Sequence, residues 1–105
     1  VKIANNIIYS APGGKCNVAP SLGTFVTYDY NIYFNGTVAV KGANDKVADP
    51  AFINRSIDGT TANFNLQAGS PAIDAGTKNI YSLKDIRGMA RPQGAGVDCG
   101  AFEYK

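Results

Sequence analysis

The chain of 105 residues is long enough for one domain, residues 1–105, with a modest buried core. Charged residues make up 17% of the chain and its net charge is +2, with lysine and arginine scattered singly, so it lacks the basic stripe of a nucleic-acid-binding protein. No apolar run approaches the ~20 residues that a membrane-spanning helix needs, so we expect no membrane insertion. Abundant glycine and asparagine favour short strands and turns over helices.

The first predicted strand covers residues 3–10. Pro12-Gly13-Gly14 ends it, because proline lacks a backbone donor and glycine admits positive φ. The chain opens directly in strand-like sequence and carries no signal peptide, which favours excision from a longer protein.

The longest predicted strand covers residues 24–34, where polar and apolar residues alternate. The core face carries the even positions Val26, Tyr28, Tyr30, Ile32 and Phe34. Tyr33 lies on the opposite, outer face and is therefore the tyrosine that we expect to stack on a sugar if the domain binds one. The next signal is Asn35-Gly36, followed by a strand at 37–41, which predicts a β-hairpin with a type I′ turn.

The remaining predicted elements are short. In chain order they are a polar loop at 43–49, a strand at 52–54, a turn at Asp58-Gly59, a strand at 62–66, an ordered irregular segment at 67–77, one turn of helix at 81–86 and a closing strand at 97–104.

The sequence also contains a weak internal repeat. Residues 6–10 (NIIYS) resemble residues 31–35 (NIYFN), an offset of 25 that keeps Ile7 over Ile32 and Tyr9 over Phe34 on one face. Repeats of about 20 to 45 residues are typical of solenoids, in which each unit buries its apolar face against a neighbour.

Two residue types bear on the cellular compartment. Cys16 and Cys99 form either a disulfide, as in extracellular domains, or two buried thiols. Asn35 and Asn54 each begin a glycosylation acceptor triplet, which agrees with a secreted setting.

Four segments resemble one known family. They are residues 49–54 (DPAFIN), 64–76 (FNLQAGSPAIDAG), 85–92 (DIRGMARP) and 97–104 (VDCGAFEY). In this order they are similar to the D-P-x-F, L-x-x-G-S-P-A-I-D-A-G and D-x-x-G-x-x-R … D-x-G-A-x-E elements that close right-handed parallel β-helix proteins of the pectate-lyase-like kind.

The resemblance implies an all-β fold, made of the C-terminal rungs and cap of a right-handed parallel β-helix. Together with the Asn35-Gly36 signal this predicts one antiparallel hairpin beside the rungs; a rearranged β-sandwich is the alternative fold. Many members are secreted or surface-anchored in bacteria and methanogenic archaea, so the resemblance also implies an extracellular or cell-surface location. Cys99 departs from the aliphatic residue usual at its position, which favours the disulfide.

The absence of histidine removes the commonest general base and the best zinc ligand. Carboxylates remain as candidates: Asp45, Asp49, Asp74, Asp85, Asp98 and Glu103. Converging acids could hydrolyse glycosides or bind Ca²⁺, whereas separate acids cap turns and pair with arginine. We expect Asp74, Arg91 and Asp98 to be structural, with no catalytic residue and no metal site; Ca²⁺ is the one cofactor left open.

The leading hypothesis is a non-catalytic structural or capping module whose partner is the upstream part of the same chain. The first alternative is a carbohydrate-binding module for a cell-wall or surface polysaccharide. The second is a fragment of a polysaccharide lyase or hydrolase whose active site lies upstream. An exposed aromatic row would favour binding, and acids converging beside a lysine or arginine would favour the enzyme.

Overall fold

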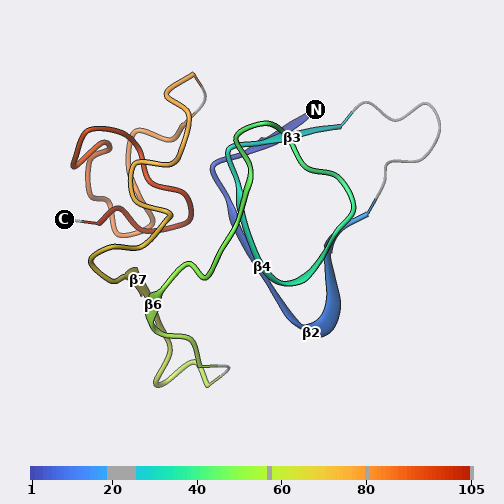
Figure 1. The fold of residues 1–105 in the computed structure, drawn as a ribbon. Coiled ribbons are helices and arrows are strands. Elements are labelled where there is room, and N and C mark those ends of the chain that lie inside the picture. The colour runs from blue at the N-terminus through green and yellow to red at the C-terminus, as the bar shows by residue number, and fades with distance from the viewer. Residues whose placement is uncertain (19–25, 57, 80, 105) are drawn as a thin grey trace.

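The fold consists of short strands joined by loops (Figure 1). The computed structural model describes residues 1–18, 26–56, 58–79 and 81–104. Its strands are β1 (Lys2–Ala4), β2 (Ile7–Asn17), β3 (Thr27–Asp29), β4 (Ile32–Val38), β5 (Lys46–Val47), β6 (Phe52–Asn54) and β7 (Asn63–Leu66). The described ranges contain no helix, which confirms the predicted all-β class. They accordingly hold no helix long and apolar enough to span a membrane.

The described part of the N-terminal half (residues 1–18 and 26–48) forms two stacked turns whose strands pair in parallel (Figure 1). β1 pairs with β3, and Ile7 to Tyr9 of β2 pair with β4, both with an offset of 25 residues. Ile7 therefore lies opposite Ile32, and Tyr9 lies opposite Phe34. This register confirms the residue-over-residue alignment that the internal repeat predicted.

A shorter third strand extends the stack. β5 pairs in parallel with β4, with Lys46 opposite Ile32 and Val47 opposite Tyr33. It falls within residues 43–49, which the sequence predicted as a polar loop. A strand of two residues is too short to display alternation, so its sequence carries no strand signal.

Three polar side chains form a ladder across these turns, and each immediately precedes a strand: Asn6 before β2, Asn31 before β4 and Asp45 before β5. The backbone N–H of Asn6 donates to Oδ1 of Asn31 at 3.0 Å, and the backbone N–H of Asn31 donates to Oδ1 of Asp45 at 2.8 Å. Nδ2 of Asn31 donates to the same Asp45 oxygen at 3.0 Å and to the carbonyl of Ile3 at 2.9 Å. The ladder thus joins successive turns where each strand begins.

Each of the two long predicted strands is divided in the structure. Asn5 separates β1 from β2 with φ 64°, and Tyr30 separates β3 from β4 with φ 60°. The N–H of Asn5 donates to the carbonyl of Tyr30 at 2.9 Å, so the two bends lie one above the other. A single residue with left-handed φ breaks a strand without disturbing the alternation of polar and apolar residues on either side of it. Alternation alone therefore predicted one continuous strand in each case. Residues 24 and 25 of the predicted strand lie outside the described residues.

The predicted hairpin at Asn35-Gly36 is wrong. A type I′ turn needs positive φ at both central residues, but of these two only Asn35 has it, with φ 68°. The chain continues in β4, where Gly36 pairs with Gly14 of β2. A Cβ atom on Gly36 would lie 2.5 Å from the Cβ of Ser10, so the close approach of β2 explains why glycine stands here.

The predicted end of the first strand at Pro12-Gly13-Gly14 is also wrong, because β2 extends to Asn17. These residues instead interrupt its pairing with β4, which shifts register between Tyr9 and Gly14. The antiparallel strand pair is β6–β7, at the two strands predicted for 52–54 and 62–66.

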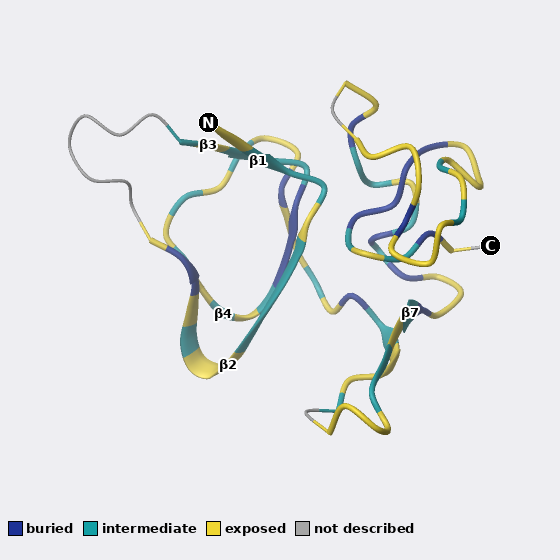
Figure 2. Cartoon of the chain, turned by 180° about the vertical axis from the view of Figure 1, so that it is seen from behind, coloured by how far each residue is buried: buried dark blue, intermediate teal, exposed yellow. Residues whose placement is uncertain are grey.

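One face of the β2–β4 pair forms the apolar core. Ile32 is 1% exposed and clusters there with Leu66, Ala72 and Cys99, and Ile7 packs against this cluster. The C-terminal loops (residues 67–104) supply half of it and lie beside the stacked turns (Figures 1 and 2). They therefore cover a side of the N-terminal half, whereas a cap was expected to close its end.

The opposite face of β4 is buried as well. Tyr33 is 0% exposed, and its hydroxyl donates to Oδ2 of Asp45 at 3.1 Å. Burial, reinforced by the negative charge of Asp45, raises the pKa of Tyr33 to about 12. The prediction that Tyr33 lies on an exposed face is therefore wrong, and its ring is closed to a sugar. Parallel strands are commonly covered on both faces, which an inside-outside pattern does not anticipate.

Two further C-terminal predictions are wrong. Residues 81–86 form no helical turn, and residues 97–104 form no strand. The backbone of the latter segment bonds to loops instead: the carbonyl of Val97 accepts from Gly76 at 2.9 Å, and the N–H of Cys99 donates to Ala72 at 3.0 Å. Alternation in 97–104 reflects burial within loops. The ordered, irregular character predicted for 67–77 is confirmed.

Of the two alternatives that the sequence left open for Cys16 and Cys99, the structure has the thiols: both cysteines are free and buried. The thiol of Cys16 lies 3.6 Å from the carbonyl of Ile8, whereas that of Cys99 lies 3.2 Å from the carbonyl of Tyr30. Burial raises the pKa of Cys99 to about 12. The two residues therefore serve as small core side chains, the alternative that the sequence left open.

Asn31→Ala should destabilise the fold strongly, because the N–H of Asn6 and the carbonyls of Ile3 and Asp29, which are partly buried, lose their side-chain partner at about 1 to 3 kcal/mol each. Asn44→Ala is the matched control, since its exposed amide makes one side-chain contact, with Asp29. Urea unfolding at neutral pH measures both. Equal losses of unfolding free energy in the two variants would contradict the importance of the ladder.

Candidate functional site

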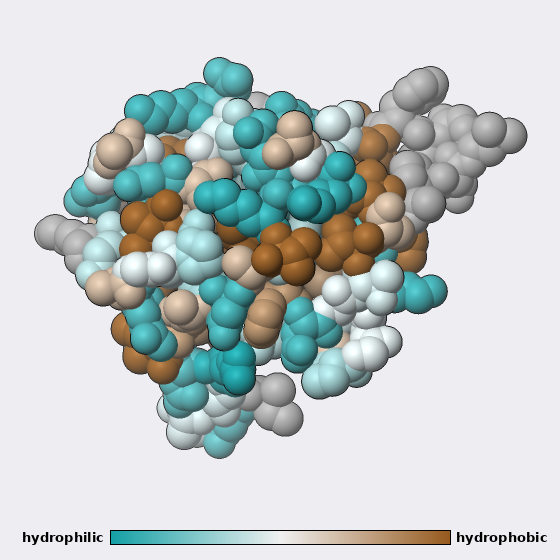
Figure 3. Space-filling model, in the orientation of Figure 1, coloured by the Kyte–Doolittle hydropathy of each residue, from teal (hydrophilic) through white to brown (hydrophobic). Residues whose placement is uncertain are grey.

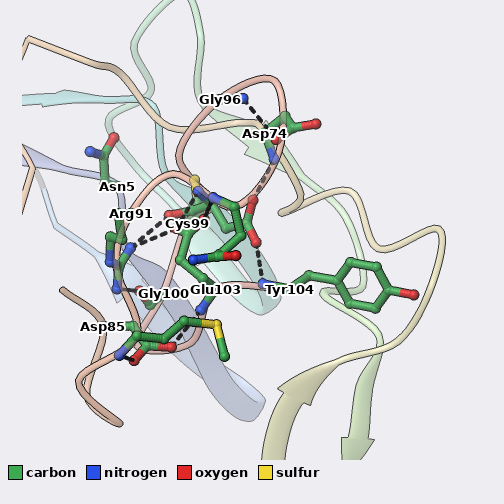
Figure 4. A network of polar contacts seen from close by, with 12 residues as sticks. Asn5, Asp74, Asp85, Arg91, Gly96, Cys99, Gly100, Glu103 and Tyr104 are labelled. Carbon is green, nitrogen blue, oxygen red and sulfur yellow. Dashed lines mark hydrogen bonds and ion pairs between the residues drawn. The ribbon is translucent and has the colours of Figure 1, made fainter. Parts of the chain in front are cut away.

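The C-terminal loops enclose a group of buried acids, shown in Figure 4. Asp85 is 6% exposed, Asp98 is 1% exposed and Glu103 is 2% exposed. A buried charge is costly unless hydrogen bonds and ion pairs compensate it, so the partners of these acids define what the cluster does.

Glu103 and Arg91 form its central ion pair. Nη1 of Arg91 lies 3.2 Å from Oε1 of Glu103, and the same guanidinium donates to the carbonyls of Asp98 and Gly100. Oε1 also accepts from the N–H of Asp98 at 2.8 Å, and Oε2 accepts from the N–H of Gln93 at 3.3 Å. Burial raises the pKa of Glu103 despite these bonds.

Asp85 is the second centre. Its Oδ1 accepts the backbone N–H groups of Arg87 and Met89 at 2.8 and 3.0 Å, and Oδ2 accepts that of Glu103 at 3.0 Å. Arg87 lies 2.9 Å from Oδ2. Burial alone would raise the pKa of Asp85, but these bonds outweigh it and lower the pKa to about 2.

Asp98 and Asp74 complete the network. Oδ1 of Asp98 accepts the N–H of Asp74 at 2.8 Å, and Oδ2 accepts that of Tyr104. Oδ1 of Asp74 accepts the N–H of Gly96 at 2.9 Å, and Asp74 itself has φ 58°. The structure therefore brings Asp74, Arg91 and Asp98, the three residues predicted as structural, into one network, in which Figure 4 labels Asp74 and Arg91.

The chemistry of this cluster is that of internal loop support. Both oxygens of Asp85, Asp98 and Glu103 accept hydrogen bonds from the chain itself. Among the described residues no group of acids and cysteines is arranged to hold a metal ion. Nε of Arg91 is buried without a hydrogen-bond partner.

A second site, which the sequence did not reveal, lies where β2 meets the β6–β7 pair. The ring of Tyr9 is 5.4 Å from that of Phe34 and 6.2 Å from that of Phe52, which in turn is 5.2 Å from that of Phe64. We call these four side chains the aromatic row. They come from four strands, β2, β4, β6 and β7. The internal repeat predicted that Tyr9 lies over Phe34, but no local pattern could have predicted that Phe52 and Phe64 join them.

Polar groups border the aromatic row on one side. Arg55 lies over the ring of Tyr9 and donates to its hydroxyl at 2.6 Å. A groove of about 410 Å³ includes Tyr9, Phe52, Phe64, Arg55 and Asn35. On the face drawn in Figure 3, apolar side chains form patches interrupted by polar ones.

The two predicted glycosylation sites lie on the surface. Asn35 and Asn54 are both exposed, and Nδ2 of Asn54 donates to the carbonyl of Thr61 at 2.7 Å. Their modification stays a prediction.

Comparison of the chain with protein-family models, with curated proteins and with solved structures finds no match in any of the three. The family resemblance therefore rests on the sequence motifs alone.

Asp74→Ala should lower the melting temperature both with and without Ca²⁺, because the N–H of Gly96 loses its acceptor and alanine is strained at positive φ. Asp74→Asn, which retains an acceptor oxygen and tolerates that φ, should stay close to the wild type. Thermal unfolding in EDTA and in CaCl₂ tests this. Loss of a wild-type stabilisation by Ca²⁺, with the melting temperature in EDTA unchanged, would indicate a metal site instead.

Asp85→Asn should reduce stability at pH 7 by about 1 to 3 kcal/mol and flatten its dependence on acid pH. The pKa of Asp85 is lower in the folded chain than in the unfolded chain, so its contribution is present above pH ~4 and is lost as the pH falls toward about 2. Denaturant unfolding between pH 7 and pH 2 measures both effects. An equally steep acid limb in the variant would assign the pH dependence to other groups.

Proposed function

We propose that this chain is a non-catalytic structural module: the last rungs of a right-handed parallel β-helix, together with a C-terminal segment that covers their side. The observation that carries the proposal is that β1–β3 and the first three residues of β2–β4, Ile7 to Tyr9, pair in parallel with the same offset of 25 residues. Parallel stacking of successive turns is the geometry of a solenoid, in which each turn buries its apolar residues against the next.

The strand edges support a partner on the N-terminal side. β1 and β2 each stand at the edge of their sheets, and no described strand pairs with their outer sides. Open edges invite further pairing, and solenoids satisfy them with additional rungs. The proposed partner is therefore an upstream part of the same polypeptide.

The acid network supports a structural role over a catalytic one. A general acid, a general base or a Ca²⁺ ligand must present a free oxygen to the reacting group or the ion. The oxygens of Asp85, Asp98 and Glu103 are directed to backbone N–H groups and arginines within the loops. The motifs that resemble surface β-helix proteins support an extracellular or cell-surface location and leave the activity of a longer protein open.

Ala72→Asp tests the covering role. Ala72 is 0% exposed within the core cluster, so a carboxylate there should release the C-terminal loops and expose the apolar face of β2 and β4. Gel filtration and binding of an apolar dye should then report association and exposed core. Ala68→Asp, at an exposed site, should stay like the wild type. An Ala72→Asp variant that stays monomeric and binds no dye would refute the covering role of the C-terminal loops. Turnover of a polysaccharide by the wild-type chain would refute the proposal that the module is non-catalytic.

Carbohydrate binding is the second candidate, and the aromatic row favours it. Aromatic rings beside a guanidinium and an amide suit a sugar, which presents an apolar face and a rim of hydroxyls. Phe64 is 44% exposed and lies in the groove with Arg55 and Asn35.

Phe64→Ala should weaken retention in gels that contain cell-wall polysaccharides by about tenfold, equal to 1.4 kcal/mol. Tyr104→Ala, which is 36% exposed but outside this groove, is the matched control. Absence of retention for the wild type across cellulose, xylan and polygalacturonate gels would remove this candidate.

A further inference from the structure

The outer side of β2, unpaired among the described residues, carries the same kind of hydrogen-bond acceptor as the inner side, where β4 pairs with it. On the inner side, Oδ1 of Asn31 accepts the backbone N–H of the residue one turn earlier, Asn6. Oδ1 of Asp45 in the same way accepts the N–H of Asn31. Asn6 holds the corresponding position before β2, one turn earlier than Asn31. Its Nδ2 donates to the carbonyl of Ala4 and to Oδ1 of Asn31. Its Oδ1 accepts no hydrogen bond from the described residues. The ladder therefore ends in an exposed acceptor where the next N–H of the series would lie.

The apolar columns end at the same edge. Ile7 lies over Ile32 and Tyr9 lies over Phe34, and no residue of the described chain extends either column beyond β2. Beside them is a groove of about 460 Å³ that contains residues of β2 but none of β4. The groove residues that matter here are Ile7, Tyr9, Phe64, Ile86 and Phe102.

The C-terminal loops form part of the wall of this groove, beside Phe52 and Phe64 of the β6–β7 pair. The N–H of Gly100 donates to the carbonyl of Asn5 at 2.8 Å, which anchors the loop beside the first turn. Ile86, 72% exposed, and Phe102 then face the space outside β2. Large exposed apolar residues around a groove usually mark a binding surface.

The geometry of this edge restricts its occupant. A parallel strand would place a backbone N–H at Asn6, an aliphatic residue over Ile7 and an aromatic residue over Tyr9. In a head-to-tail stack a second copy would offer β5 to this edge, and β5 is two residues long, too short to cover Asn6, Ile7 and Tyr9 together.

We propose that the outer edge of β2 and the groove bordered by Ile86 and Phe102 bind one further turn of the same polypeptide, running parallel to β2. The inference rests on the proposed function. It adds the residue pattern of that turn, Asn-aliphatic-x-aromatic, and it assigns Ile86 and Phe102 to the contact.

A tandem chain tests the inference, with a second copy of residues 1–25 placed before Val1 and carrying Ile8→Val, so that its peptides differ in mass from those of the original residues 7–17. The offset of 25 brings the copied Asn6 over Asn6 and the copied Ile7 over Ile7. Hydrogen exchange in peptides covering 7–17 should slow at least about tenfold relative to the 105-residue chain, because β2 ceases to be an edge strand.

Two exposed residues provide matched variants of the tandem chain. Ile86→Asp should restore fast exchange in residues 7–17, whereas Leu83→Asp, 74% exposed but outside the groove, should not. In the 105-residue chain both variants should melt like the wild type. Protection that survives Ile86→Asp would overturn the role of the groove.

The remaining outcomes separate this inference from the proposed function. Fast exchange of residues 7–17 in the tandem chain, with β4 slow in both chains, would overturn the inference alone. Fast exchange of β4 in the 105-residue chain would overturn the proposed function itself. A dimer of the 105-residue chain by light scattering, with residues 7–17 already protected, would identify a second copy as the occupant and overturn the assignment.

Discussion

The structure depends on a buried carboxamide, that of Asn31. Its amide and carbonyl groups bond to the turn before and the turn after it, through Asn6 and Asp45, while the residue is 0% exposed. A one-residue slip of β4 against β2 would leave these groups unpaired in the interior and would also turn Ile32 away from the core. The polar ladder and the apolar column therefore specify the same register of β4 against β2.

Both faces of β4 have to be covered by other parts of the chain. β4 carries Ile32 on one face and Tyr33 on the other, and both are fully buried. The N-terminal half covers the Tyr33 side, with Asp45 as the hydroxyl partner, but it has nothing to cover the Ile32 side. The C-terminal loops fill this need. Because loops lack strand partners for their backbone N–H groups, buried acids such as Asp85 supply the acceptors instead.

The sequence predicts the fold correctly where a local residue pattern has a single structural explanation. The repeat of residues 6–10 in 31–35 predicts the stacking correctly, because both copies meet the same neighbours. Alternation fails at Tyr30, whose positive φ leaves no trace in hydropathy, and at Asn35-Gly36, where glycine serves close packing against Ser10 and not a turn. The repeat predicts Tyr9 over Phe34, but the rest of the aromatic row could not be predicted, because the β6–β7 pair meets β2 only in the folded chain.

The same physical device appears at both ends of the molecule. Asp45 ends the ladder by accepting backbone N–H groups, and Asp98 and Glu103 hold the C-terminal loops in the same way. Acids used in this manner stabilise the fold because their oxygens are occupied, and for that reason they are poor candidates for chemistry. What the described surface offers to other molecules is of a different kind: the unpaired edge of β2, the acceptor of Asn6 and the rings around Tyr9. These features suit recognition by shape and hydrogen bonding, and the proposed role in assembly is based on them.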